Sequence, residues 1–259
     1  MIDQLPNEGV GFFGAGAEST NMGQGDRTMD TLEIRYTFDF PDGERIEFPL
    51  EFDEQDFTVV VAERDSWPEW TALGAHQCSH CPLDVAASPR CPLARALVPV
   101  VEATADLVSH TDVRAEAVVP ERRIVVDTNV GEALRSLMGL IIPTSGCPHT
   151  AYFKPMARFH LPFSSADETL YRVCSMHRLA QRMRAVVGLD EDEAFEGLAQ
   201  VYADINLVNT HVAERLLEAA GEDSSRSAVA LLDVFAQLIP FQFDQALDQL
   251  RGLFGAYLR

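Results

Sequence analysis

The residues with the clearest potential for chemistry are four cysteines. Cys78, Cys81 and Cys91 lie within fourteen residues of one another, and Cys147 follows 56 residues after Cys91. A Cys-x2-Cys pair presents two thiolates from one tight turn, and two more thiolates complete the four-sulfur shell of a zinc ion or an iron–sulfur cluster. The sequence therefore predicts one soft-metal site at these four cysteines, holding either a [4Fe-4S] cluster or Zn²⁺.

Three of the cysteines, Cys81, Cys91 and Cys147, are each followed by proline. Proline after a ligand cysteine occurs in bacterial ferredoxins, and it removes an N–H donor beside the sulfur. Zinc ribbons and fingers commonly use two Cys-x2-Cys pairs, so the single pair here departs from those patterns. The pattern favours an iron–sulfur cluster but leaves zinc open. It also leaves open cysteines that are simply small buried hydrophobic residues.

Three histidines lie within two residues of the cysteines: His76, His80 and His149. An imidazole can replace a cysteine ligand, or it can donate a hydrogen bond from outside the ligand shell. A structural or solvent-facing role is the alternative for each of them. The fifth cysteine, Cys174, lies on a predicted helix among apolar residues, and we expect it to be structural.

Two further regions combine polar and aromatic residues. Lys154, Arg158 and His160 stand in the proline-rich segment 148–163, which we expect to be extended and to line a pocket for an anionic ligand. The alternative is that the two cations pair with some of the forty carboxylates. A polar set interrupts the apolar residues of a later helix and predicts a ligand site or a hydrogen-bonded cluster: Tyr202, Asp204, Asn206, Asn209 and His211.

Composition excludes several classes of protein. With 259 residues, 47% of them hydrophobic, the chain can bury a core without needing a metal merely to fold. The formal net charge of −20 argues against nucleic acid and anionic membranes as partners. No apolar stretch approaches the ~18 residues of a membrane span, and residues 1–30 lack the pattern of a secretory signal. We therefore expect a soluble, cytoplasmic protein with reduced thiols or a metal site.

The elements that must position the cysteines follow from periodicity. Alternating apolar residues predict a β-hairpin over 32–52, with Pro49 placing its second strand at an edge, a third strand over 58–62 and a second hairpin over 113–126. Helical periodicity predicts helices over about 92–109, 130–140, 167–187, 192–219 and 228–257. These elements predict an α+β fold, with a small antiparallel β-sheet lobe followed by a mostly helical lobe.

The same pattern suggests three segments. Residues 1–30 are expected to be a flexible Gly-rich tail, residues 31–128 a β-rich lobe carrying three of the cysteines, and residues 129–259 a helical lobe carrying the fourth. A single continuous domain over 31–259 is the alternative to two lobes. In either case Cys147 must be brought to the other three by the fold.

The cysteine motifs also carry a resemblance. His76-Gln77-Cys78-x2-Cys81-Pro82-Leu83, Cys91-Pro92, Ser145-Gly146-Cys147-Pro148-His149 and Arg158-Phe159-His160-Leu161-Pro162 resemble an uncharacterised bacterial family known only as a domain of unknown function. The similarity runs from about residue 32 to the C-terminal helices. The resemblance implies that the cysteine set is shared by related proteins, and it transfers no catalytic role.

Three functions are compatible with these observations. The leading hypothesis is a metal protein in which four thiolates close the coordination shell, in a structural, redox-sensing or electron-transfer role. The second is a metal-dependent enzyme with an open coordination position, in which His149 or His160 takes part in acid–base chemistry. The third is a module whose helices bind a protein partner while the metal is only structural.

Overall fold

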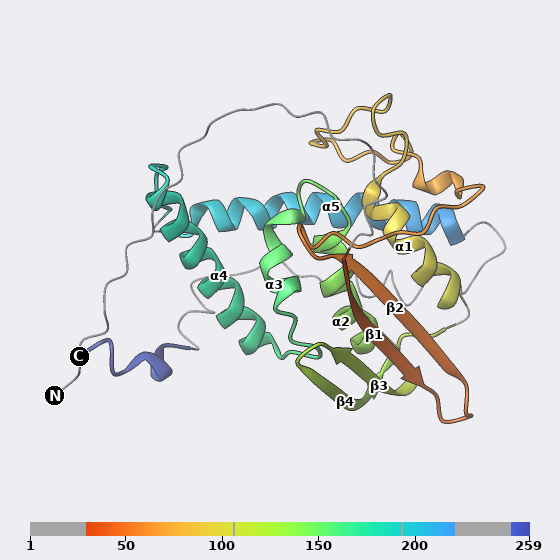
Figure 1. Cartoon of the computed structure of the whole chain (residues 1–259), viewed down its shortest axis with the longest axis horizontal. Helices are drawn as coiled ribbons and strands as arrows, with labels where there is room; N and C mark the ends of the chain where they lie inside the picture. Colours follow the sequence, from red (N-terminus) through yellow and green to blue (C-terminus); the bar gives the residue numbers. More distant parts are fainter. Residues whose placement is uncertain (1–29, 106, 193, 221–249) are drawn as a thin grey trace.

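The computed structural model describes residues 30–105, 107–192, 194–220 and 250–259 (Figure 1). The predicted Gly-rich tail, apart from Asp30, and most of the predicted last helix lie outside this part of the chain.

A four-stranded antiparallel sheet forms one face of the molecule. Its strands are β1 (Thr31–Asp39), β2 (Arg45–Asp53), β3 (Asp112–Val119) and β4 (Arg122–Asn129), in the order β2-β1-β3-β4. Both predicted hairpins are confirmed by the pairing of β1 with β2 and of β3 with β4. Pro49 lies opposite Arg35 on β2, which is an edge strand and so tolerates the missing N–H donor.

In the described part of the chain, five helices follow or interrupt the strands. They are α1 (Pro92–Ala103), α2 (Val130–Thr144), α3 (Lys154–Arg158), α4 (Ala166–Val186) and α5 (Glu196–Ala220), with short 3₁₀ turns η1 (Glu69–Thr71), η2 (Ala151–Phe153) and η3 (Arg251–Phe254). The long helix α4 begins where the sequence indicates, because Ser165 and Glu168 form a reciprocal capping box. The α+β class predicted from the sequence is confirmed.

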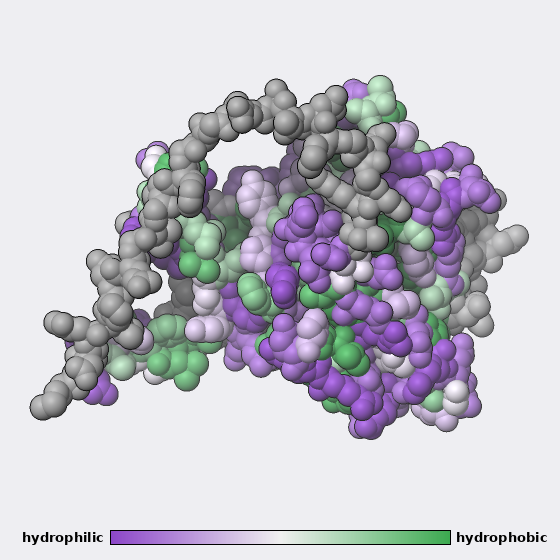
Figure 2. Space-filling model, in the orientation of Figure 1, coloured by the Kyte–Doolittle hydropathy of each residue, from purple (hydrophilic) through white to green (hydrophobic). Residues whose placement is uncertain are grey.

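One hydrophobic core joins the sheet to the helices. The inner face of the sheet contributes Tyr36, Phe38 and Phe52, each with no exposed surface, and α2 contributes Leu134 and Leu137. The same cluster includes residues of α1 and α5, so it contains residues from both sides of the predicted boundary near residue 128. This continuity favours the single-domain alternative, although the boundary itself stays a prediction. The opposite face of the sheet is largely hydrophilic (Figure 2).

The predicted third strand over 58–62 is wrong. Val59 makes one isolated bridge to Phe52, and its N–H donates to the carbonyl oxygen of Thr144 at the end of α2. Residues 58–60 pair with the end of β2 through two backbone hydrogen bonds, from the Asp53 N–H to the Thr58 carbonyl and from the Val60 N–H to the Glu51 carbonyl, but the pairing stops after one bridge and the segment also bonds to α2. The apolar run indicated burial correctly, but it did not identify the partner that takes up its hydrogen bonds.

The helix bounds differ from the predictions near proline. α1 continues through Pro99 and ends at Ala103, where Thr104 caps it by donating to the Val100 carbonyl. α2 extends past residue 140 to Thr144, with Pro143 in its last turn. The segment 148–163 is not extended as expected, because η2 and α3 occupy its middle. Pro155 stands in the first turn of α3, where the missing N–H costs no helical hydrogen bond.

Candidate metal centre

Cys78 and Cys81 lie on a loop whose two ends are joined by backbone hydrogen bonds. The N–H of Leu73 donates to the Pro89 carbonyl at 2.9 Å, and the N–H of Cys91 donates to the Thr71 carbonyl at 2.8 Å. Within the loop, the N–H of Cys81 donates to the Cys78 carbonyl at 3.0 Å, which closes a tight turn between the two thiols. We call residues 73–91 the cysteine loop. Figure 1 shows it in gold beside the last turns of α5.

Cys91 occupies the N-cap position of α1. Its backbone is extended, and Pro92 is the first helical residue. The N-terminus of a helix favours negative charge, because its first N–H groups have no partner within the helix. The Cys91 side chain itself makes no capping hydrogen bond to these N–H groups.

Cys147 follows the end of α2 after a turn that depends on glycine. Ser145 caps the helix, and Gly146 adopts a φ of +89°, which residues with a side chain rarely adopt. The N–H of Cys147 then donates to Ser145 Oγ at 3.3 Å. A Cβ atom built on Gly146 would lie 3.6 Å from Pro92 Cβ, so this turn contacts the start of α1 directly beside Cys91.

The four thiols influence one another electrostatically. Burial, and then the neighbouring Cys91, Cys147 and Cys81, raise the pKa of Cys78 to about 11. Burial also raises the pKa of Cys147, while N–H groups of His149 and Thr150 oppose this rise. The contacts of Gly146 with Pro92 and of His149 with the His80 carbonyl place the segment around Cys147 beside the segments of the other three cysteines. Negative charge at one thiol disfavours negative charge at the others, so four thiolates together need a cation.

The thiols do not already form a ligand shell. No group of three or more Cys, His, Asp or Glu side chains in the described part of the chain is arranged to hold a metal ion as it stands. All five cysteines are free thiols. The donor set fits a soft metal chemically, and two of the four donors stand on an irregular loop whose backbone is not fixed by a helix or strand. The role of the cysteines as ligands stays a prediction.

Two of the three predicted histidines stack beside the thiols. The rings of His80 and His149 lie 3.9 Å apart, and His149 Nε2 donates to the His80 carbonyl at 2.9 Å. Burial, followed by the charge of His149, lowers the pKa of His80. Neither ring nitrogen of His80 makes a well-formed hydrogen bond within the described residues, although the backbone of Asp204 lies near enough to affect its pKa.

The third predicted histidine contacts carboxylates of α5. His76 Nδ1 lies 3.4 Å from Glu214 Oε2, and His76 Nε2 lies 3.2 Å from Glu218 Oε2. The same Glu214 oxygen lies 3.0 Å from His211 Nδ1. Four of the seven histidines of the chain therefore gather where the cysteine loop meets α5. Sequence analysis singled out His211 but missed Glu214 and Glu218, which share its helix face at helical spacing.

Arg215 is the residue near the thiols that sequence analysis missed entirely. It is only 2% exposed, and its guanidinium donates to the carbonyls of Trp70 at 2.7 Å, Ala72 at 2.6 Å and Leu73 at 3.0 Å. The charge of Arg215 also lowers the pKa of Cys78. The available signal was an arginine between the apolar positions Val212 and Leu216, where an unpaired charge is costly.

The cationic segment after Cys147 does not line an anion pocket with its predicted residues. Lys154 Nζ donates to Thr58 Oγ1 at 2.8 Å and to the Asp56 carbonyl at 3.0 Å. Arg158 lies over the Phe57 ring at 5.7 Å. His160 is buried against Tyr36 in the core and is not part of the histidine cluster beside the thiols. Structural contacts thus account for the two cations and for His160.

The remaining predicted residues lie on the helices. Cys174 is buried in a small second cluster with Leu170, Val173, Leu198 and Leu250. In the polar set of α5, Asp204 accepts a hydrogen bond from Gln200 at 3.0 Å. Asn209 is buried, and its side-chain amide has no hydrogen-bond partner within the described residues.

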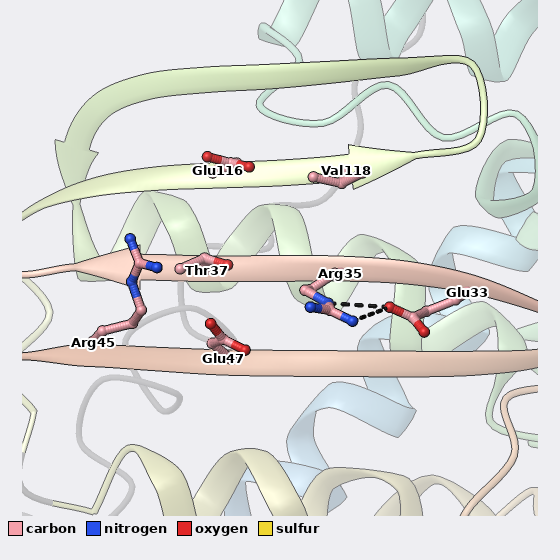
Figure 3. Close-up of a pocket in the computed structure, with 7 residues that line it drawn as sticks. All are labelled: Glu33, Arg35, Thr37, Arg45, Glu47, Glu116 and Val118. Carbon is pink, nitrogen blue, oxygen red and sulfur yellow. Dashed lines mark hydrogen bonds and ion pairs between the residues drawn. The ribbon is translucent and has the colours of Figure 1, made fainter.

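An open depression of about 410 Å³ lies on the outer face of the sheet (Figure 3). Its lining is Glu33, Arg35, Thr37, Arg45, Glu47, Glu116 and Val118. Its charged groups are committed to exposed ion pairs, such as Arg35 with Glu33 at 2.6 Å. Such pairs contribute little and are typical of a solvated sheet face. The depression contains none of the residues that the sequence predicts to be functional.

Comparison with known proteins agrees with the resemblance of the motifs. A family model described as a domain of unknown function, DUF6901, matches residues 34–255. No curated protein and no solved structure matches the chain. Among the described residues, no helix combines the length and the apolar character that crossing a membrane requires.

Proposed function

The chain belongs to the DUF6901 family, and from this premise we propose that it is a metal-binding protein whose ligands are Cys78, Cys81, Cys91 and Cys147. The observation that carries this proposal is the contact between the segment around Cys147 and the other cysteines: the Gly146 turn lies against Pro92 beside Cys91, and His149 Nε2 donates to the His80 carbonyl beside Cys81. Such an arrangement of partly buried thiols needs a cation to become anionic.

Four thiolates fill the coordination shell, so no position is left for a substrate or water. A closed site favours a structural, redox-sensing or electron-transfer role over Lewis-acid catalysis. The cysteine–proline pattern favours a [4Fe-4S] cluster, and zinc is the alternative. For the whole chain we propose a cytoplasmic location, where free thiols stay reduced, and no nucleic-acid partner, because of the net charge of −20.

The decisive experiment is anaerobic purification followed by metal analysis and visible absorption spectroscopy. A [4Fe-4S] cluster predicts about four iron and four sulfide per chain with broad absorption near 400 nm. Zinc predicts about one metal per chain without visible absorption. Replacing Cys174 by serine is the matched control, because this thiol lies in a separate cluster and its loss should leave metal content unchanged. The absence of both iron and zinc from anaerobically purified protein would overturn the proposal.

A second candidate function is a metal-dependent enzyme with an open coordination position. The stacked His80 and His149 beside the thiols favour it, because the His80 ring nitrogens lack well-formed hydrogen bonds in the described part. In this case one cysteine is not a ligand, and a histidine acts in proton transfer. Proton transfer by His160, the other histidine considered for this role, has no such support, because the His160 ring forms a hydrogen bond with Tyr36 inside the core.

The variant Cys147→Ser distinguishes a closed site with four cysteine ligands from an open site in which Cys147 is not a ligand. A closed site predicts that this variant loses most of its bound metal and becomes less stable to heat, because one of four ligands is gone. An open site without Cys147 predicts that metal content stays within about 20% of wild type. Metal per chain and the melting temperature of the purified variant, beside those of Cys174→Ser, provide the measurement.

A partner-binding module with a structural metal remains the third proposal. The apolar side chains of Leu179, Met183, Val186 and Val187 on and after α4 are 58–73% exposed. Such residues are the kind that a helical partner would cover. This proposal has the same metal site as the first proposal and adds that the helices bind a protein partner.

A further inference from the structure

Arg215 on α5 is a buried cation that donates hydrogen bonds to three backbone carbonyls. It forms no ion pair with a carboxylate of the described residues, and the neighbouring Glu214 and Glu218 contact His76 instead. The side chain is 2% exposed, so water does not solvate the charge. Three carbonyl dipoles compensate part of the cost of burying it, but they do not neutralise it.

The cysteine site can supply the missing negative charge, because Arg215 contacts the segment from which the cysteine loop begins. The three carbonyls that Arg215 contacts belong to Trp70, Ala72 and Leu73, at the base of the cysteine loop. The N–H of Cys91 donates to the carbonyl of Thr71 at 2.8 Å, and Thr71 stands in the chain between Trp70 and Ala72, whose carbonyls Arg215 contacts. A charge in a poorly hydrated environment acts more strongly on a neighbour than it would in water.

A metal held by four thiolates carries the negative charge that the surroundings of the Arg215 guanidinium lack. Zinc(II) with four thiolates is doubly negative, and so is an oxidised [4Fe-4S] cluster with four thiolates. Four neutral thiols would instead leave the guanidinium without a counter-charge. The buried cation therefore favours the metal-loaded, anionic state of the site over the protonated, metal-free state.

We propose that Arg215 is the counter-charge of the four-cysteine site and stabilises the doubly negative metal–thiolate complex as a positioning residue. This inference rests on the proposed function. It assigns to α5 a direct part in metal selection, because a site with fewer thiolates carries less negative charge and gains less from the guanidinium.

Three variants separate charge from hydrogen bonding. Arg215→Gln removes the charge and keeps amide donors, whereas Arg215→Lys keeps the charge and loses the planar fork that contacts three carbonyls. Arg172→Gln is the matched control. Arg172 also donates to two backbone carbonyls, those of Met156 and Phe159, from a half-buried position on α4, and it lies outside the cysteine loop contacts.

The measurement is metal affinity by chelator competition if zinc is bound, or the reduction potential if the protein carries an iron–sulfur cluster. Arg215→Gln is expected to weaken zinc binding by about tenfold or more, or to lower the potential, because reduction adds negative charge to the cluster. Arg215→Lys should stay within about threefold of wild type, and Arg172→Gln should not change the metal readout. Melting temperatures of the metal-free variants record the purely structural effect.

Two results would overturn the inference. One is an Arg215→Gln protein with wild-type affinity or potential and only a lower melting temperature. The other is an Arg215→Lys protein that loses metal as severely as Arg215→Gln, since hydrogen bonding and not charge would then explain the effect. If Arg215→Gln does not fold, Arg215→Lys decides: affinity within threefold supports the inference, and a tenfold loss overturns it.

The outcomes also distinguish this inference from the function on which it depends. Wild-type protein without iron or zinc would remove both. Wild-type protein that loses its metal in Cys78→Ser, but keeps it in Arg215→Gln, would remove only the role of Arg215.

Discussion

At the scale of single residues, Tyr36 and His160 form a buried polar pair beneath the sheet. Tyr36 Oη lies 2.5 Å from His160 Nε2 and 2.8 Å from Ser136 Oγ, which also accepts the N–H of Phe163 at 2.9 Å. Burial, followed by the charge of Arg172, lowers the pKa of His160 to about 3. The imidazole is therefore neutral in the folded protein over the whole physiological range.

This neutral histidine predicts sensitivity to acid. The ordinary pKa of histidine is near 6.5, so below that pH the unfolded chain binds one proton that the folded chain does not. The free energy of unfolding then falls by up to about 1.4 kcal/mol per pH unit, and the loss ends only near pH 3. His160→Gln removes this contribution. Between pH 7 and pH 5, we expect wild type to lose about 2 kcal/mol more than the variant in urea denaturation.

His110→Gln is the matched control for this prediction, because the His110 side chain is exposed whereas that of His160 is buried. It should follow the wild-type pH dependence. Equal losses in wild type and His160→Gln would contradict the prediction.

At the scale of elements, the end of α2 determines where Cys147 lies. Gly146 adopts a φ of +89°, and an alanine there would be strained by about 1–2 kcal/mol. Gly146→Ala should lower the free energy of unfolding by this amount and reduce bound metal, because the strain is relieved by moving the adjacent Cys147. Urea denaturation and metal analysis measure both effects.

Gly139→Ala provides the comparison on the same helix. Gly139 lies inside α2, and a Cβ atom there would meet nothing within 4 Å. Alanine should stabilise the helix by about 0.5–1 kcal/mol and leave the metal unchanged. If both variants bind metal equally and differ only in stability, the turn at Gly146 does not position a ligand.

The elements also show how much the sequence could predict. The alternation in residues 32–52 and 113–126 identified both hairpins, because a sheet with one solvated face leaves that pattern in the chain. The run 58–62 carried no information about its partner, and Val59 bonds to Thr144 in α2. The middle of 148–163 was expected to be extended because of its prolines, yet Pro155 begins a short helix.

The candidate site was predictable in its composition but not in its surroundings. Spacing and residue type identified the cysteines and the three nearby histidines. The contribution of α5 was hidden, because helical periodicity shows that a face is buried without showing what it packs against. Arg215 reaches backbone carbonyls 142–145 residues earlier in the chain, and carbonyls have no signature in the sequence.

At the scale of the whole molecule, the core is built mainly from apolar residues of the sheet and helices, with Cys147 at its margin and Cys78 and Cys91 packed against it. Tyr36, Phe38, Leu134 and Leu137 are fully buried between the sheet and α2. Removal of metal with a chelator should therefore lower the melting temperature while leaving the far-ultraviolet circular dichroism at 25 °C nearly unchanged. Bound ligand at a thousandfold excess over its Kd contributes about 4 kcal/mol, which sets the scale of the shift.

Cys78→Ser supplies the control for metal removal, because a protein without the site should not respond to chelator. A complete loss of the helical signal in chelated wild type would mean that the fold needs the metal. A chelator effect of equal size in Cys78→Ser would mean that it acts elsewhere.

The contact between Arg215 and the base of the cysteine loop joins segments 145 residues apart in the chain. During synthesis the N-terminal part leaves the ribosome first, so the sheet and the thiols emerge well before α5. Until residue 215 has left the exit tunnel, the carbonyls at the base of the cysteine loop cannot accept hydrogen bonds from its guanidinium. The cysteine loop of the nascent protein therefore lacks this contact for several seconds after its thiols have emerged.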